Sequence, residues 1–167
     1  MTDIRLGTQG WSYADWVGVF YPPQTKPSDY LRFYSQVFDT VELDTTFYST
    51  PRPALVRSWA ETTPDGFLFT AKLPQAITHE KHLKDCEREL DAFVSAMRLL
   101  GPKLGALHIQ LPPDFRDFLR LLNSHGVEYL LIGGYAVAYH GYPRATAGRR
   151  AGFAVDARST SSARRHR

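Results

Sequence analysis

Glu42, Lys72 and Gln110 are polar residues at or near the carboxyl ends of short apolar segments, each typical of a buried strand. His79 follows Lys72 closely in the sequence. A carboxylate or an imidazole can move a proton, and a lysine ammonium can hold a phosphate or carboxylate as a point charge. We therefore take Glu42, Lys72 and His79 as candidate catalytic residues, and Gln110 as a candidate ligand-binding residue.

Trp11, Tyr13 and Tyr48 are aromatic residues that follow predicted strands, and they are further candidates for binding a ligand. Together with the polar residues, they would suit a small anionic or sugar-like ligand. A structural explanation is also open: the carboxylate and the ammonium would pair with each other, the amide would satisfy backbone groups, and the aromatic rings would pack in the core. No group of residues has the spacing of metal ligands, so no metal is expected.

Predicted strands alternate with amphipathic helices along the first two thirds of the chain. The strands are predicted at residues 4–8, 39–43, 67–72 and 106–111. Apolar residues at helical spacing predict helices that begin near Tyr30 and Pro53, and a third that ends before Gly101. The alternation implies parallel strands joined by right-handed crossovers, and the predicted fold class is α/β.

The composition suits one sizeable core, since 43% of the 167 residues are hydrophobic. No apolar run approaches the roughly 20 residues that cross a bilayer, so no membrane association is expected. Cys86 is the single cysteine, which excludes an internal disulfide and fits a reducing cytoplasm. The net charge of +3 is uneven, because residues 144–167 hold seven arginines and one acid.

Four separated segments resemble the motifs of the YecE-like family, a family of domains of unknown function. They are Gly-Thr-Gln-Gly-Trp-Ser-Tyr at 7–13, Val-Glu-Leu-Asp-Thr-Thr-Phe-Tyr at 41–48, Phe-Thr-Ala-Lys-Leu-Pro at 69–74 and Gln-Leu-Pro-Pro at 110–113. The resemblance covers residues 3–115. It departs from the usual pattern at Gln9, where serine is common, and at Asp44, where asparagine is common.

The resemblance implies a barrel of alternating parallel strands and helices, with its site at the carboxyl ends of the strands. Because an eight-stranded barrel takes about 250 residues, residues 1–115 are expected to form a half, or partial, TIM-type barrel. Its open edges would favour self-association. The expected function is that of an uncharacterised YecE-like domain protein, truncated or chimeric and without intact catalysis. The alternative is a barrel-type enzyme or binder acting on a phosphorylated, sugar-like or nucleic-acid ligand.

Residues 116–146 are similar to the start of small nucleotidyltransferases of the polymerase-beta-like superfamily, and they predict an appended helix-strand-helix fragment. This resemblance implies that Gly133 and Gly134 approach the nucleotide phosphates where a helix begins. The family then needs an acidic pair to hold Mg²⁺, whereas this chain has Ala-Gly-Arg-Arg at 147–150. We therefore expect at most a degenerate nucleotidyltransferase, and no bound Mg²⁺.

Residues 147–167 are predicted to form a disordered basic tail, since they are rich in arginine, alanine and serine. Such a tail can attract nucleic acid through the phosphates, without sequence preference. The codons GGN-CGN-CGN-GCN for residues 148–151, read one base later, permit Asp-Val-Glu-Leu. A frameshift would explain the missing acidic pair, and a gene without an acidic pair in the shifted frame would exclude it.

Overall fold

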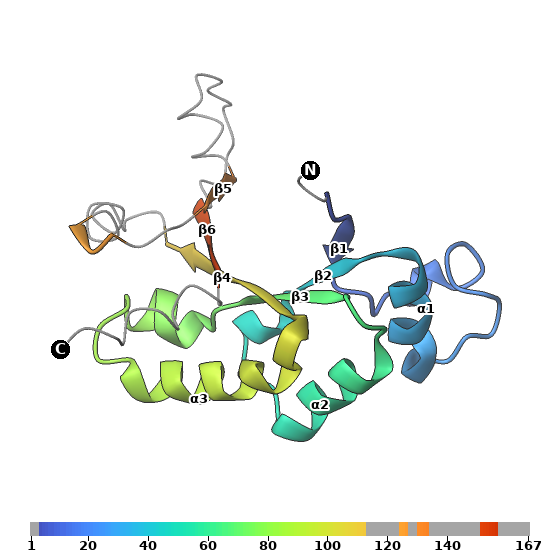
Figure 1. Ribbon diagram of the computed structural model, residues 1–167, viewed down its shortest axis with the longest axis horizontal. Coiled ribbons are helices and arrows are strands. Elements are labelled where there is room, and N and C mark those ends of the chain that lie inside the picture. The colour runs from blue at the N-terminus through green and yellow to red at the C-terminus, as the bar shows by residue number, and fades with distance from the viewer. Residues whose placement is uncertain (1–3, 113–123, 127–129, 134–150, 157–167) are drawn as a thin grey trace, which may run out of the picture.

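The structure, a computed structural model, describes residues 4–112, 124–126, 130–133 and 151–156. Its central feature is a sheet with the strand order β1-β2-β3-β4-β6-β5 (Figure 1). Strands β1 to β4 are parallel, whereas β6 is antiparallel to both β4 and β5. The bounds are β1 (Gly7–Gln9), β2 (Thr40–Leu43), β3 (Leu68–Lys72), β4 (Leu104–Leu111), β5 (Leu130–Gly133) and β6 (Ala151–Asp156). The four parallel strands confirm the predicted α/β class.

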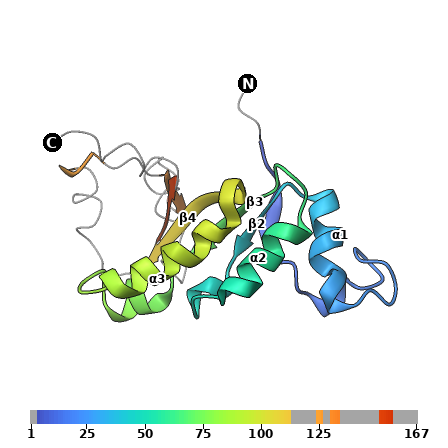
Figure 2. The ribbon, with the colours of Figure 1, turned by 60° about the horizontal axis from the view of Figure 1, so that its bottom comes forward.

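Three α-helices lie on one side of the parallel strands, as the two views of the ribbon show (Figures 1 and 2). They are α1 (Tyr30–Val37), α2 (Pro53–Thr62) and α3 (Glu87–Met97). Short helical turns complete the connections: η1 (Ala14–Trp16), η2 (Pro27–Asp29), η3 (Thr45–Phe47), η4 (Ala76–Glu80) and η5 (Arg98–Lys103). Among the described residues, no helix is long and apolar enough to span a membrane.

The core lies between the sheet and these helices. Val41 and Phe69 are fully buried on the helix side of β2 and β3, and Tyr34, Val56 and Phe93 of the three helices are buried with them. Alternation along a strand sends every second side chain to the same face. The residues that alternate with Val41 and Phe69 therefore point to the opposite face, away from the three α-helices (Figures 1 and 2).

The ends of the helices follow local sequence signals. Pro53 stands in the first turn of α2, where its fixed φ and missing N–H are tolerated. At the other end of α2, Lys103 Nζ donates hydrogen bonds to the carbonyls of Ala60 (2.6 Å) and Thr63 (2.5 Å). A cation there satisfies carbonyls that lack helical partners. Lys103 thus fixes the start of β4 against α2.

Part of the tail differs from its prediction. Ala151–Asp156 was expected to be disordered but forms β6, so the prediction is wrong for these six residues. The segment is the apolar cluster of the tail, and the edge of β4 offers backbone N–H and C=O groups to pair with. Within the predicted helix-strand-helix fragment, the structure describes one strand, β5. Apart from residues 124–126, the rest of the predicted appended fragment lies outside the described residues, and so do Gly134 and the tail arginines.

Tyr34 of α1 ties the first two strands together. Its buried hydroxyl accepts a hydrogen bond from the backbone N–H of Thr8 (2.7 Å) and donates one to the carbonyl of Thr40 (3.0 Å). Gly7 completes this junction, because a Cβ there would lie 2.0 Å from the Thr40 carbonyl oxygen. The edge strand β1 is therefore held by a side-chain hydroxyl as well as by its ladder with β2.

We predict that Tyr34→Phe lowers the free energy of unfolding by about 1 kcal/mol, because it leaves a part-buried N–H and a part-buried C=O without their shared partner. Urea denaturation followed by circular dichroism measures the loss. Tyr48→Phe is the matched control, since Tyr48 is exposed and its hydroxyl makes no recorded hydrogen bond. Equal stability of the two variants would contradict the role of Tyr34.

Candidate active site

A row of polar side chains crosses the face of the sheet that is turned away from the helices. Gln9, Glu42 and Thr70 pair with one another across β1, β2 and β3. Paired residues of parallel strands share a face, and so do residues two apart on one strand. Lys72, two residues beyond Thr70 at the carboxyl end of β3, therefore lies on the same face as Glu42.

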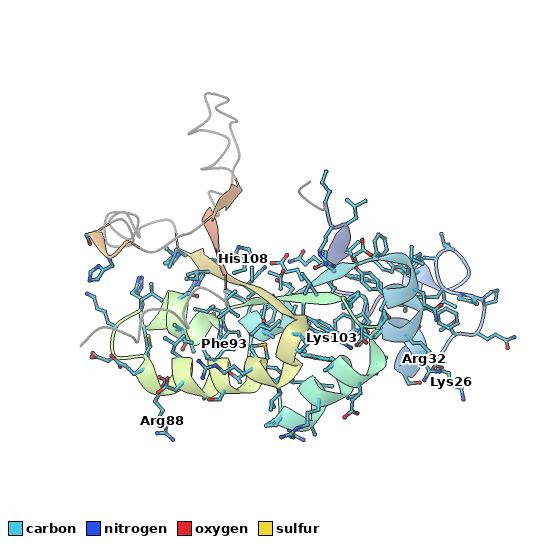
Figure 3. The ribbon with its side chains drawn as sticks, in the orientation of Figure 1. Lys26, Arg32, Arg88, Phe93, Lys103 and His108 are labelled. Atoms are coloured by element: carbon cyan, nitrogen blue, oxygen red, sulfur yellow. The ribbon has the colours of Figure 1, made fainter. Side chains whose placement is uncertain are left out.

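His108 reaches this face because of an irregularity in β4. Phe69 and Ala71 are two residues apart on β3, but they pair with Leu104 and Leu107, which are three residues apart on β4. The extra residue is a β-bulge, which shifts the alternation of side chains by one position. Leu104 and Leu107 both pack against the core, and His108 lies on the other face, beside the end of β3 (Figure 3).

These side chains form one connected charged network at the carboxyl ends of the strands. Lys72 Nζ lies 2.5 Å from Asp44 Oδ1 and 3.4 Å from Glu42 Oε1. The same Glu42 oxygen lies 2.7 Å from His108 Nδ1. The contacts thus run from Asp44 to Lys72, from Lys72 to Glu42 and from Glu42 to His108. Acidic and basic side chains alternate along the network.

The network satisfies groups that would otherwise be costly to bury. Lys72 is buried, and an unpaired ammonium in this position would be strongly destabilising. The pKa of Glu42 is lowered, first by the hydrogen bond from His108, against a rise from burial, and further by the charge of Lys72. Glu42 is therefore ionised at neutral pH. No trio of His, Cys, Asp or Glu among the described residues could hold a metal ion.

Thr46 fixes the distance between the ends of β2 and β3. Its buried hydroxyl oxygen lies 2.6 Å from the carbonyl of Leu43 and 2.6 Å from the carbonyl of Lys72. A hydroxyl has one proton to donate, so the two carbonyls share it. The turn η3, which contains Thr46, thereby holds the backbone of Lys72 beside the strand that carries Glu42.

The family model described as "Protein of unknown function DUF72" matches residues 5–139. The chain belongs to the DUF72 family. The match confirms the YecE-like resemblance, and it extends beyond residue 115, where the sequence analysis places a domain boundary. That boundary and the nucleotidyltransferase-like segment stay predictions.

Curated DUF72 relatives support the assignment. The chain is 34% identical over 112 residues to the UPF0759 protein YecE of Escherichia coli (strain K12), which is 67% of this chain and 39% of that protein. It is 33% identical over 118 residues to the UPF0759 protein YunF of Bacillus subtilis (strain 168), which is 67% of this chain and 41% of that protein. The chain thus spans about two fifths of the length of the curated relatives it matches.

Two solved structures of DUF72 family proteins are similar to this chain. A crystal structure of a DUF72 family protein from Enterococcus faecalis V583 matches with a TM-score of 0.50 at 26% identity, covering 62% of this chain and 38% of that one. A DUF72 family protein from Thermotoga maritima MSB8 matches with a TM-score of 0.43 at 25% identity, covering 73% of this chain and 62% of that one. The first match shows that the parallel sheet and its helices are arranged as in this family.

The structure brings two of the three candidate catalytic residues, Glu42 and Lys72, into one network. His79 lies in η4, where its Nδ1 is 2.9 Å from the Thr78 hydroxyl and its ring packs edge-on against Phe47 at 5.1 Å. The ion pair between Glu42 and Lys72 is the structural alternative that the sequence left open. Lys72 therefore does not stand as an isolated point charge.

The candidate ligand-binding residues occupy several environments. The ring of Trp11 packs edge-on against Trp59 of α2 in the core, at a centroid distance of 5.7 Å. Tyr13 is exposed and donates its hydroxyl to the carbonyl of Gln9. The other three candidates come from later elements: Tyr48 is exposed after η3, Gln110 follows His108 by two positions on β4, and Gly133 ends β5.

Sequence reasoning missed Asp44 and His108 as site residues. A signal existed for each. Asp44 directly follows β2, where the family motif commonly has asparagine, and His108 is separated from the candidate Gln110 by one residue of a strand. Residues so spaced share a face, so the selection of Gln110 implied a position for His108.

We predict that the contribution of Glu42 to stability depends on pH. The folded-state pKa of Glu42 is lowered, so its stabilising contribution is present above the ordinary value of 4.5 and is lost as the pH falls through the lowered value. At pH 7, Glu42→Gln should reduce the free energy of unfolding by about 1–3 kcal/mol, because it removes a charged hydrogen-bond partner.

The difference between wild type and Glu42→Gln should shrink as the pH is lowered below 4.5, as urea denaturation at several pH values would measure. Glu61→Gln on the exposed face of α2 is the matched control and should show no such trend. A difference that is constant with pH would mean that the ionised carboxylate of Glu42 is not the stabilising species.

Proposed function

We propose that the charged network of Asp44, Lys72, Glu42 and His108 is a general acid–base site for a small ligand. In this site His108 accepts the proton, and Glu42 orients the imidazole and stabilises its charged form. The observation that supports this proposal is the contact of 2.7 Å between Glu42 Oε1 and His108 Nδ1, combined with a buried Nε2 that has no hydrogen-bond partner among the described residues. A carboxylate that holds one imidazole nitrogen leaves the other nitrogen free to accept a proton.

The chemistry follows from the tautomer that the carboxylate selects. Ionised Glu42 can only accept a hydrogen bond, so the ring nitrogen that it contacts must donate. In the neutral imidazole the proton therefore lies on Nδ1, and Nε2 carries the lone pair. A ligand hydroxyl placed at Nε2 would donate its hydrogen bond there, and His108 would act as the base while Glu42 stabilises the resulting cation. Lys72 holds Glu42 ionised and in position.

The four parallel strands are proposed to be the first half of a TIM-type barrel. Support comes from the position of the network at the carboxyl ends of the strands, where barrel enzymes bind their ligands. The match to two fifths of the length of the curated relatives agrees with it. The remaining wall of the site would come from outside the four strands, and the described residues alone would bind a ligand weakly.

Self-association is the second proposal, and the edge at β1 favours it. Ile4 and Leu6 lead into β1 with exposed fractions of 85% and 68%, and Val37 at the end of α1 is exposed near them. The hydrogen bond from Asp39 N–H to the Leu6 carbonyl (3.3 Å) places this segment beside the start of β2. Apolar side chains next to an edge strand offer a surface for a second copy of the chain.

Two other functions rest on sequence alone. A degenerate nucleotidyltransferase activity and non-specific nucleic-acid binding depend on Gly134 and on the tail arginines, which lie outside the described residues. A truncated or chimeric origin of the chain likewise stays a hypothesis about the gene.

We predict that ¹⁵N spectra will show the neutral imidazole of His108 with its proton on Nδ1 and a bare Nε2. On addition of sugars, sugar phosphates or short oligonucleotides at millimolar concentration, at least one class of compound should shift the Nε2 resonance. Glu42→Gln should remove both the tautomer preference and the response, because its amide no longer selects the donor nitrogen.

Glu61→Gln is the control that changes the same side chain on an exposed helix face. Protonation of His108 at Nε2 in the wild type would refute the proposed assignment of the base. Failure of every compound to move the Nε2 resonance would refute the ligand site, even if the tautomer is as expected.

For self-association, we predict that sedimentation velocity at tens of micromolar shows species heavier than a monomer, and that Leu6→Lys shifts them toward the monomer by placing a charge in the apolar edge. Leu55→Lys, on the exposed face of α2, is the control and should leave the distribution unchanged. A compact monomer for the wild type at all concentrations would rule the association out.

A further inference from the structure

The charges of the site are not arranged for an anion. Lys72 is the lysine of the network, and it contacts two carboxylates, Asp44 at 2.5 Å and Glu42 at 3.4 Å. With Glu42 and Asp44 ionised, these three side chains carry a net charge of minus one. A phosphate that approaches the ammonium must also approach both carboxylates, and the repulsion offsets the attraction.

The relative exposure of these groups points the same way. The side chain of Lys72 is 7% exposed and that of His108 is 11% exposed, whereas Glu42 and Asp44 are 27% and 35% exposed. The cationic group thus lies beneath the carboxylates. A ligand arriving from solvent meets hydrogen-bond acceptors first.

The acceptors are suited to hydroxyl groups. Glu42 uses Oε1 for both Lys72 and His108, and the structure records no contact of its Oε2 with another described residue. His108 Nε2 is likewise without a partner among the described residues, but it is buried, so a hydroxyl reaches it only when the atoms that cover the ring move. Two acceptors on neighbouring side chains can each receive one hydroxyl of a polyhydroxylated ligand. The same net charge attracts an ammonium group of a ligand, but Lys72 neutralises one of the two carboxylates and so reduces that attraction.

From these contacts we infer that the site selects an uncharged, polyhydroxylated ligand and rejects its phosphorylated form, with Asp44 as the residue that determines this specificity. The inference rests on the proposed function, since it concerns the ligand of the same site. Asp44 neutralises Lys72 without occupying Glu42 Oε2 or His108 Nε2. Replacement of its charge by an amide therefore leaves the acceptors in place and frees the ammonium to attract an anion.

Glucose and glucose 6-phosphate form a matched pair of probes that differ by one phosphate, and glucosamine adds a cationic probe. Each is titrated into the full chain at low ionic strength, and the Nε2 resonance of His108 gives the dissociation constant. In the wild type we expect glucose 6-phosphate to bind about tenfold more weakly than glucose. In Asp44→Asn this difference should disappear or reverse. Asp65→Asn, an exposed carboxylate outside the network, should behave as the wild type.

A second measurement needs no variant: added salt screens charges and should reduce the preference of the wild type for glucose over its phosphate. Equal or tighter binding of glucose 6-phosphate by the wild type would overturn the inference and leave the proposed acid–base site standing. Preferential binding of glucosamine by more than about tenfold would overturn it in favour of a cation site. If none of the three probes moves the Nε2 resonance but another class of compound does, the inference is overturned as well. If no compound moves it, the proposed function is refuted too.

Discussion

The burial of one ammonium group organises the polar face of this protein. Lys72 ends β3 with its side chain almost fully enclosed, and such a charge is tolerated only with close opposite charges. Asp44 and Glu42 supply them from the adjacent strand end. Because Glu42 is drawn to Lys72, its carboxylate also lies within reach of His108. The pairing of one buried cation therefore sets the geometry of the residues that could perform chemistry.

The fold supplies this arrangement through parallel strand order. The network draws on β2, β3 and β4, which are far apart in sequence, and parallel pairing brings their carboxyl ends to one edge. The opposite face of the same strands buries the core under α1, α2 and α3. Stability and site geometry thus rest on alternate residues of the same short segments. A change that slips the register of β3 would affect both at once.

The sequence predicted the parts of this structure that depend on local patterns. Apolar periodicity located the four parallel strands and the three helices to within a few residues, and strand ends identified Glu42 and Lys72. His108 was missed although it lies two residues from Gln110 in the predicted strand, because its contact with Glu42 joins residues that are 66 positions apart in the sequence. The strand Ala151–Asp156 was missed because it needs the edge of β4, a partner distant in sequence. Contacts between distant segments were therefore the limit of the sequence analysis.

The bulge in β4 determines which side chains of this strand face the charged network. Counted from Leu104 without the bulge, His108 would fall in phase with the leucine and face the helices, and an aliphatic residue would replace it on the polar side. One additional residue at Gly105–Ala106 inverts that phase for the remainder of the strand. Removing this one residue would let the strand run regularly, with Leu107 two positions after Leu104 and His108 still on the polar side. The extra residue therefore reconciles two leucines three positions apart with a single buried face, and it leaves the imidazole on the opposite one.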